Sequence, residues 1–169
     1  MTILIANAID FLAALIQVAS GSIKQKTKIL IVQTVQILMQ AVSMLLLGGV
    51  TGAVNNIFSC YRNYLCYKNR LSTFWKAVLI AASILSTVLL NEQGLWGILP
   101  AVVCTVYILF MDTKDPIKFK FLVMMTFVPW CLYHFVIRSY VGALFDAATV
   151  ITNAITLCVM IREKNAAQE

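Results

Sequence analysis

Several apolar segments of this 169-residue chain carry polar side chains at helical spacing. In the first segment, Asn7, Asp10 and Gln17 follow one another at intervals of three and seven residues. Such intervals place side chains along one face of a helix. The second segment has a similar stripe, which consists of Gln33, Gln36, Gln40 and Ser43. Because amides both donate and accept hydrogen bonds, these faces could bind a small, polar, uncharged organic solute.

Aromatic residues and prolines occupy the matching places later in the chain. The later stripes consist of Gly97, Pro100 and Tyr107 in one segment and Val123, Thr126, Trp130, Tyr133 and His134 in the next. Aromatic faces stack on planar or sugar-like rings and so extend the predicted solute chemistry. Pro100 and Pro129 each remove a backbone hydrogen bond, and each is either a hinge for gating or a fixed bend. Likewise, the amides either line a path or only hold helices together.

Few charged residues lie inside the apolar segments. An ionised carboxylate at that depth costs at least about 2.5–3.5 kcal/mol, so Asp10 and Asp146 must be paired, protonated or in contact with water. Both acids permit coupling of transport to protons; for Asp146, an ion pair with Arg138 is the structural alternative. Arg62 either snorkels to the near end of its segment or closes an inner gate. His134 is either a packing residue or a proton relay.

A catalytic site is not expected from these residues. An enzyme needs a clustered nucleophile and base or a set of metal ligands, whereas the chain offers one histidine and two separated embedded acids. Only convergence of Asp10, His134 and Asp146 would change this expectation. The five cysteines are odd in number, lie in apolar runs and form no C-x-x-C pair. We expect them to be free and to fill apolar space, and we expect no metal and no cofactor.

The overall composition places these segments in lipid. Apolar residues make up 61% of the chain and charged residues 12%, whereas a soluble domain typically has about 45–50% and about 25%. This composition excludes a water-soluble enzyme and a disordered chain. The formal net charge of +6 does not indicate nucleic-acid binding, because the basic residues separate apolar runs instead of forming one face.

The apolar runs predict an all-α protein with seven transmembrane helices. The predicted spans are 3–22, 28–48, 51–67, 72–91, 94–111, 119–137 and 141–161. With the N-terminus outside, all the basic residues except Arg138 fall on the cytoplasmic side, so the C-terminus is predicted to be cytoplasmic. The first run lacks the basic region of a cleaved signal peptide and is therefore interpreted as a span.

The chain is similar to itself at an offset of about 90 residues. The matching positions are Gly52, Asn56, Ser59 and Asn63 in the third segment, and Gly142, Asp146, Thr149 and Asn153 in the seventh. Coincidence between two apolar segments is the alternative. The repeat divides the single transmembrane domain 1–169 into two three-helix units, 3–67 and 94–161. The helix at 72–91 is then an inversion linker that makes the two units parallel.

Short motifs distributed along the chain resemble the YgjV-like bacterial inner-membrane proteins. They are residues 46–53 with 57–62, residues 99–102, and residues 130–134 with the following Asn153. More distantly, the layout of three, one and three helices is similar to that of SWEET sugar carriers and PnuC vitamin facilitators. The YgjV-like resemblance implies the bacterial inner membrane. The SWEET resemblance implies that Asn63 and Asn153 contact the solute, because an asparagine on the third helix of each SWEET unit contacts the sugar.

Together these observations favour a facilitator or carrier of a small polar metabolite, sugar-like or vitamin-like, that works by alternating access between the two units. The predicted substrate-binding residues are Asn63, Asn153, Asn56, Asp146, Trp130, Tyr133 and Gln40. The predicted gating or coupling residues are Asp10, His134, Pro100, Pro129 and Arg62. The alternative is a membrane scaffold or partner subunit that transports nothing. The predicted partners are the lipid bilayer and the solute, without nucleic acid; association of copies of the chain stays open.

Overall fold

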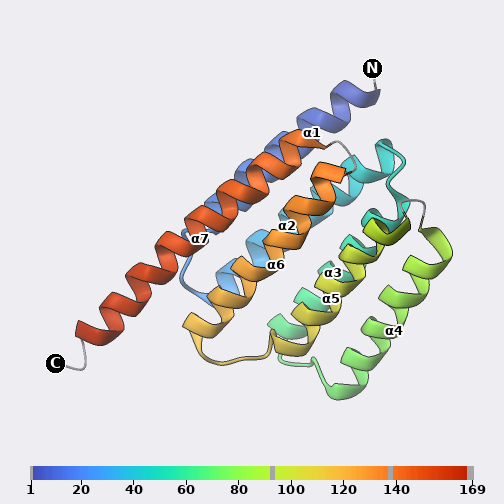
Figure 1. The fold of residues 1–169 in the computed structure, drawn as a ribbon. Helices are drawn as coiled ribbons and strands as arrows, with labels where there is room; N and C mark the ends of the chain where they lie inside the picture. Colours follow the sequence, from blue (N-terminus) through green and yellow to red (C-terminus); the bar gives the residue numbers. More distant parts are fainter. Residues whose placement is uncertain (1, 92–93, 137–138, 167–169) are drawn as a thin grey trace.

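The computed structural model describes residues 2–91, 94–136 and 139–166. Over these residues the chain folds into seven α-helices and one short 3-10 helix, η1 (Figure 1). The elements are α1 (Thr2–Ser20), α2 (Lys26–Leu46), α3 (Val50–Tyr67), α4 (Thr73–Leu90), η1 (Gly94–Ile98), α5 (Leu99–Phe110), α6 (Pro116–Val136) and α7 (Tyr140–Ala166). The all-α prediction is confirmed, and each predicted span overlaps one of the α-helices.

Local signals explain where several helices begin. Ser72 accepts a hydrogen bond from the backbone N–H of Trp75 and caps α4. Asp115 accepts one from the backbone N–H of Ile117, and Pro116 starts α6, where its missing N–H costs nothing. Pro100 lies in the first turn of α5 for the same reason, directly after η1, and so does not interrupt that helix. Pro129, in contrast, lies inside α6.

Five of the described helices are long and apolar enough to cross a membrane alone, whereas the sequence analysis predicted seven. These five are α1, α2, α4, α6 and α7. The segment Gly94–Phe110, which comprises η1 and α5, is apolar but shorter. Helix α3 has 18 residues, but it buries a series of polar side chains that lower its hydropathy. Both therefore depend on neighbouring helices for a place in the bilayer.

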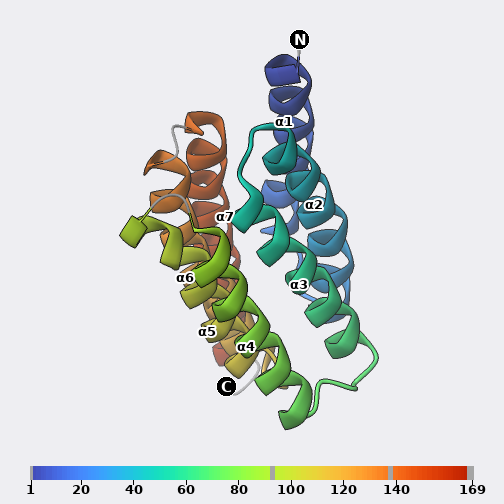
Figure 2. The ribbon, with the colours of Figure 1, turned by 90° about the vertical axis from the view of Figure 1, so that its right-hand side faces the viewer.

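The helices form a single bundle with α1, α2 and α3 on one side and α4 to α7 on the other (Figure 2). Helix α1 packs on α2 and α7, α3 packs on α2, α4 and α5, and α6 packs between α5 and α7. Large apolar side chains such as Leu15, Leu85, Phe121 and Ile151 point outward, whereas amides and carboxylates are buried inside. This distribution is the reverse of that of a soluble protein and indicates that lipid surrounds the bundle.

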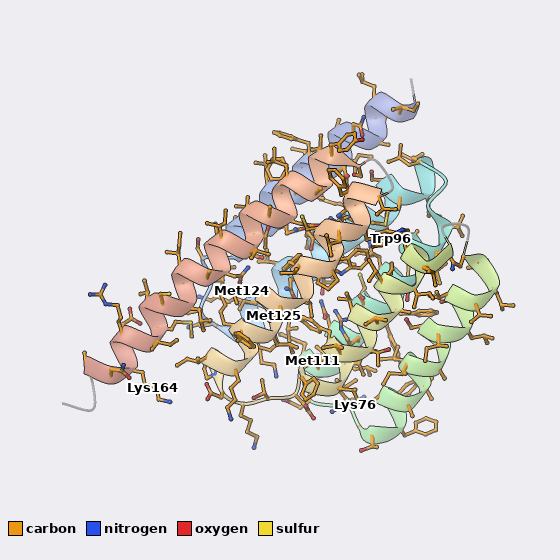
Figure 3. The ribbon with its side chains drawn as sticks, in the orientation of Figure 1. Lys76, Trp96, Met111, Met124, Met125 and Lys164 are labelled. Atoms are coloured by element: carbon orange, nitrogen blue, oxygen red, sulfur yellow. The ribbon has the colours of Figure 1, made fainter. Side chains whose placement is uncertain are left out.

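The described basic side chains other than Arg62 gather at one end of the bundle, where α1 ends and α2 begins. We call it the basic end, and Figure 3 shows Lys76 and Lys164 there. Its basic residues are Lys24, Lys26, Lys28, Lys68, Arg70, Lys76, Lys114, Lys118, Lys120, Arg162 and Lys164. This arrangement matches the charge sorting predicted from the sequence. The side of the membrane that the basic end faces stays a prediction.

Candidate functional site

A polar cavity lies at the centre of the bundle. Its volume is about 50 Å³, which is room for about four water molecules. Every described α-helix except α4 contributes to its wall. The lining residues are Gln17, Gln33, Gln36, Ile37, Gln40, Asn56, Ser59, Arg62, Val103, Cys104, Tyr107, Thr126, Phe127, Trp130, His134 and Asp146. The cavity therefore lies between α1, α2 and α3 on one side and α5, α6 and α7 on the other.

One end of the cavity is organised by Gln17, whose amide connects three helices. It donates hydrogen bonds to Asp146 Oδ1 and, at 3.3 Å, to Thr149 Oγ1, both on α7. Its oxygen accepts hydrogen bonds from Gln36 Nε2 at 2.9 Å and Gln40 Nε2 at 3.2 Å, both on α2. Gln17 is 1% exposed, so these are its partners in place of water.

A buried carboxylate and an imidazole meet beside this amide. Asp146 Oδ2 lies 2.6 Å from His134 Nδ1, and both side chains are fully enclosed. The ring of Trp130 stacks on that of His134 with centroids 5.7 Å apart. Gly142 lets α7 approach the imidazole, because a Cβ there would lie 3.2 Å from its Cγ atom. Asp10 is also buried, and its carboxyl interacts electrostatically with both members of the pair.

The cavity wall also contains a buried guanidinium group. Arg62 is 4% exposed, and its Cζ atom lies 4.2 Å from the centre of the Tyr107 ring. Its Nε and Nη2 atoms donate to Asn63 Oδ1 at 3.2 and 3.0 Å. Tyr107 is held in turn by a hydrogen bond from its hydroxyl to Gln33 Oε1 at 3.0 Å. The cavity wall thus contains both a cation, Arg62, and a carboxylate, Asp146.

The structure brings part of the predicted site together at the cavity. Of the predicted substrate-binding residues, the wall contains Gln40, Asn56, Trp130 and Asp146. Of the predicted gating residues, it contains Arg62 and His134. Asn63, Asn153, Tyr133, Asp10, Pro100 and Pro129 are not part of the wall. The predicted site and the observed cavity therefore overlap only in part.

The two asparagines of the repeat lie behind the cavity wall. Asn63 reaches Arg62 on one side and, through a 3.4 Å hydrogen bond, Thr34 Oγ1 on the other. Asn153 is fully buried and donates to the backbone oxygen of Thr149 at 2.8 Å. Its Oδ1 has no hydrogen-bond partner. Among the described residues, every other enclosed side-chain N or O atom has one. Their positions suit the orientation of neighbouring groups more directly than contact with a solute.

Several cavity residues were visible in the sequence only as stripe positions. Gln17, Gln33, Gln36, Tyr107 and Thr126 all lie in the polar stripes, but the predicted site omitted them. Ser59 belongs to the repeat and was omitted too. Ile37, Val103, Cys104 and Phe127 carry no chemical signal in the sequence. For Asp146, the suggested partner Arg138 lies outside the described residues, and the observed partners are Gln17 and His134.

A second, wider groove lies on the outer surface between α2 and α3. Its volume is about 230 Å³, and its wall consists of Leu30, Ile31, Thr34, Val35, Asn63, Tyr64 and Tyr67. The groove faces the lipid side of the bundle, since Ile31, Val35 and Tyr64 are exposed apolar or aromatic side chains. The polar chemistry is concentrated in the smaller central cavity, which is therefore the candidate site.

Comparison with known protein families agrees with a bundle that faces lipid. The model of the Imp-YgjV family, described as bacterial inner membrane protein, matches residues 4–164. The chain belongs to this family. The resemblance to YgjV-like proteins is thereby confirmed, and the chain is a bacterial inner-membrane protein. No curated protein and no solved structure matches this Imp-YgjV chain. The similarity to SWEET and PnuC carriers stays a prediction.

Proposed function

We propose that this Imp-YgjV protein is a carrier that moves a small polar metabolite through the centre of the bundle. The observation that carries the proposal is the central cavity, whose polar wall is built from six helices. Polar groups in membrane helices are expensive, and those that face a cavity commonly mark a solute path. At about 50 Å³ the cavity has room for only a few water molecules, so passage of a metabolite requires the two units to move apart.

The contacts support two related three-helix units. Helix α1 packs on α7, and α5 packs on α3, so the first helix of each unit meets the third helix of the other. Asn56 Nδ2 lies 3.5 Å from Met44 Sδ, and Asp146 Oδ2 lies 2.6 Å from His134 Nδ1. Asn56 and Asp146 are 90 residues apart, as are Met44 and His134. A shared contact at the repeat offset favours a common unit over coincidence, with α4 as the linker.

A transport role also fits the chemistry of the His134–Asp146 pair better than catalysis does. The imidazole makes one described hydrogen bond, to Asp146, and no described serine, threonine or cysteine hydrogen-bonds its ring. A nucleophilic mechanism would require such a group beside the base. The pair is suited to holding a proton inside the bundle, which is the coupling role that the sequence predicted for these residues.

A non-transporting scaffold is the second candidate function. The Gln17 network favours it, because four buried side chains on two other helices find their partners in one amide. Interhelical hydrogen bonds of this kind stabilise membrane bundles without any solute. In a scaffold the cavity would stay closed, whereas a carrier must open it to each side of the membrane in turn.

Access to Cys104 separates the two functions without knowledge of the solute. This cavity residue would be kept as the only cysteine, with the other four replaced by alanine, and treated with a membrane-impermeant thiol reagent from either side of sealed vesicles. A carrier predicts labelling from both sides; labelling from neither side would contradict it. Lys164→Cys, in a variant without native cysteines, is the control, because this exposed position at the basic end should react from one side only.

Identification of the solute requires a second experiment. Purified protein would be screened for thermal stabilisation by sugars, vitamins, nucleosides, amino acids and small acids, because a ligand of the folded state raises the melting temperature. Each compound that stabilises the protein would then be tested for uptake into proteoliposomes. Binding without uptake in any arm would favour the scaffold.

A further inference from the structure

Arg62 is a buried cation without a buried anion to balance it. No ion pair among the described residues involves Arg62. Its guanidinium is 4% exposed and forms part of the cavity wall, so it does not snorkel to the end of α3. An enclosed charge without a counter-ion costs several kcal/mol. Proteins retain such a charge inside a membrane where it has a functional partner.

The contacts of Arg62 leave part of its hydrogen-bonding fork unused. Nε and Nη2 share one acceptor, the amide oxygen of Asn63, and the guanidinium plane lies over the ring of Tyr107. No described group accepts a hydrogen bond from Nη1. Asn63 and Tyr107 thus fix the orientation of the group and provide a neutral dipole and a π-face, but neither neutralises its charge.

The remaining cavity wall presents neutral groups to Arg62. Helix α2 contributes Gln33 and Gln36, α3 contributes Ser59, and α6 contributes Thr126. The one carboxylate in the wall, Asp146, is engaged by Gln17 at one oxygen and His134 at the other. It is therefore not free to serve as the counter-ion of Arg62, and it would repel a second anion placed beside it.

We propose that the solute of this carrier has a carboxylate group and that Arg62 binds it. Arginine pairs with a carboxylate through two parallel N–H···O bonds, a geometry that an ammonium or an amide does not offer. Space for about four water molecules is also space for about four or five non-hydrogen atoms, which suits a compact carboxylate and is too small for a whole sugar. This inference rests on the proposed carrier function and replaces the uncharged solute expected from the sequence.

Asn63 offers a sharp test, because its isosteric replacement supplies the missing anion from within. In Asn63→Asp, the new carboxylate lies where the amide oxygen already accepts two hydrogen bonds from Arg62. The variant retains the shape of the site and forms an internal ion pair. We expect it to fold as the wild type does and to bind a carboxylate at least about tenfold more weakly, because the arginine is already neutralised.

The binding probes are acetate and its neutral isostere acetamide. Binding would be followed through the fluorescence of Trp130 in purified protein whose other two tryptophans are replaced by phenylalanine, with sodium chloride as the matched salt. We expect a saturable response to acetate alone, weakened in Asn63→Asp and in Arg62→Gln. Arg70→Gln is the matched control, because it removes an exposed arginine near the same end of α3. It should bind acetate as the parent protein does.

The wild-type comparison decides the proposal even if a variant fails to fold. Equal responses to acetate and acetamide, or to acetate and chloride, would overturn the proposal, and so would unchanged acetate binding in a folded Asn63→Asp protein. Uptake of acetate into proteoliposomes tests the carrier function separately. Arg62-dependent binding of acetate without uptake would support the carboxylate site and refute the carrier function. Arg62-independent uptake of neutral solutes would support the carrier function and refute the carboxylate site.

Discussion

Replacing Gln17 with methionine should weaken the bundle more than any other single change in the cavity amides. Methionine has nearly the same length and shape as glutamine but cannot donate or accept these hydrogen bonds. Gln17→Met therefore removes the contacts to Asp146 and Thr149 on α7 and those from Gln36 and Gln40 on α2. The change removes the hydrogen bonds that Gln17 makes with both helices and nearly preserves the packing volume.

The size of the effect follows from the individual contacts. Interhelical hydrogen bonds in membranes average about 0.6 kcal/mol and reach about 1.7 kcal/mol, with charged acceptors at the upper end. The bond to the Asp146 carboxylate belongs there, the 2.9 Å bond from Gln36 belongs near the average, and the bonds at 3.2 and 3.3 Å contribute less. We expect a loss of about 2–3 kcal/mol in the free energy of unfolding.

The assay is equilibrium unfolding in mixed detergent micelles, followed by far-UV circular dichroism. Gln40→Met is the matched control, because Gln40 makes one described side-chain hydrogen bond, at 3.2 Å, and borders the cavity, where water replaces it. Its loss should stay below about 1 kcal/mol. Equal losses in the two variants would refute the assignment of Gln17 as the amide that joins three helices.

Two further predictions concern the basic end. Lys120 is buried and donates hydrogen bonds to the backbone oxygens of Gly21 and Ile23. Lys120→Met should therefore lower the free energy of unfolding by about 1–3 kcal/mol, whereas Lys118→Met, at an exposed position, should lower it by less than about 0.5 kcal/mol. Similar losses in the two variants would contradict the role of Lys120. A hydrogen bond from Lys76 lowers the pKa of Asp112. The Asp112 carboxylate therefore stabilises the fold above its unfolded pKa of about 3.9. This contribution disappears as the pH falls through the lower pKa of the folded state. Because Asp112 is mostly exposed, the effect is at most about 1 kcal/mol. Asp112→Asn should make the melting temperature depend less steeply on pH between about pH 5 and 3. The same pH dependence of the melting temperature in the variant and the wild type would rule the contribution out.

The helices could be predicted from the sequence because lipid leaves few alternatives for an apolar run. Their ends were less predictable, because charge is a poor marker of where a helix stops. The sixth predicted span begins at 119, but α6 begins at Pro116, where Asp115 caps it and Lys118 lies in the first turn. Helix α7 continues to Ala166 through charged residues, because a helix need not end where the hydrocarbon does.

The cavity could be predicted only in part, because a stripe identifies a helix face but not the partner of that face. Gln40 and Asn56 follow from their stripes. The inward direction of Arg62 depends on Tyr107, which is 45 residues away and joins it through the packing of α3 on α5. No spacing within α3 distinguishes an arginine that snorkels from one that stacks on a ring of another helix.

The two segments least able to cross a membrane alone carry the cation of the cavity and the ring beneath it. Helix α3 supplies Arg62, and the short α5 supplies Tyr107. The same polar side chains that disqualify α3 as an independent span require the other helices to enclose it: Asn55 accepts a hydrogen bond from Ser83 of α4, and Asn63 bonds Thr34 of α2. Assembly of the bundle and formation of the site are therefore one event. Helix α4 takes part in it without contributing to the cavity wall, because it supplies hydrogen-bond partners to the face of α3 that carries Asn55, while Arg62 on α3 lines the cavity.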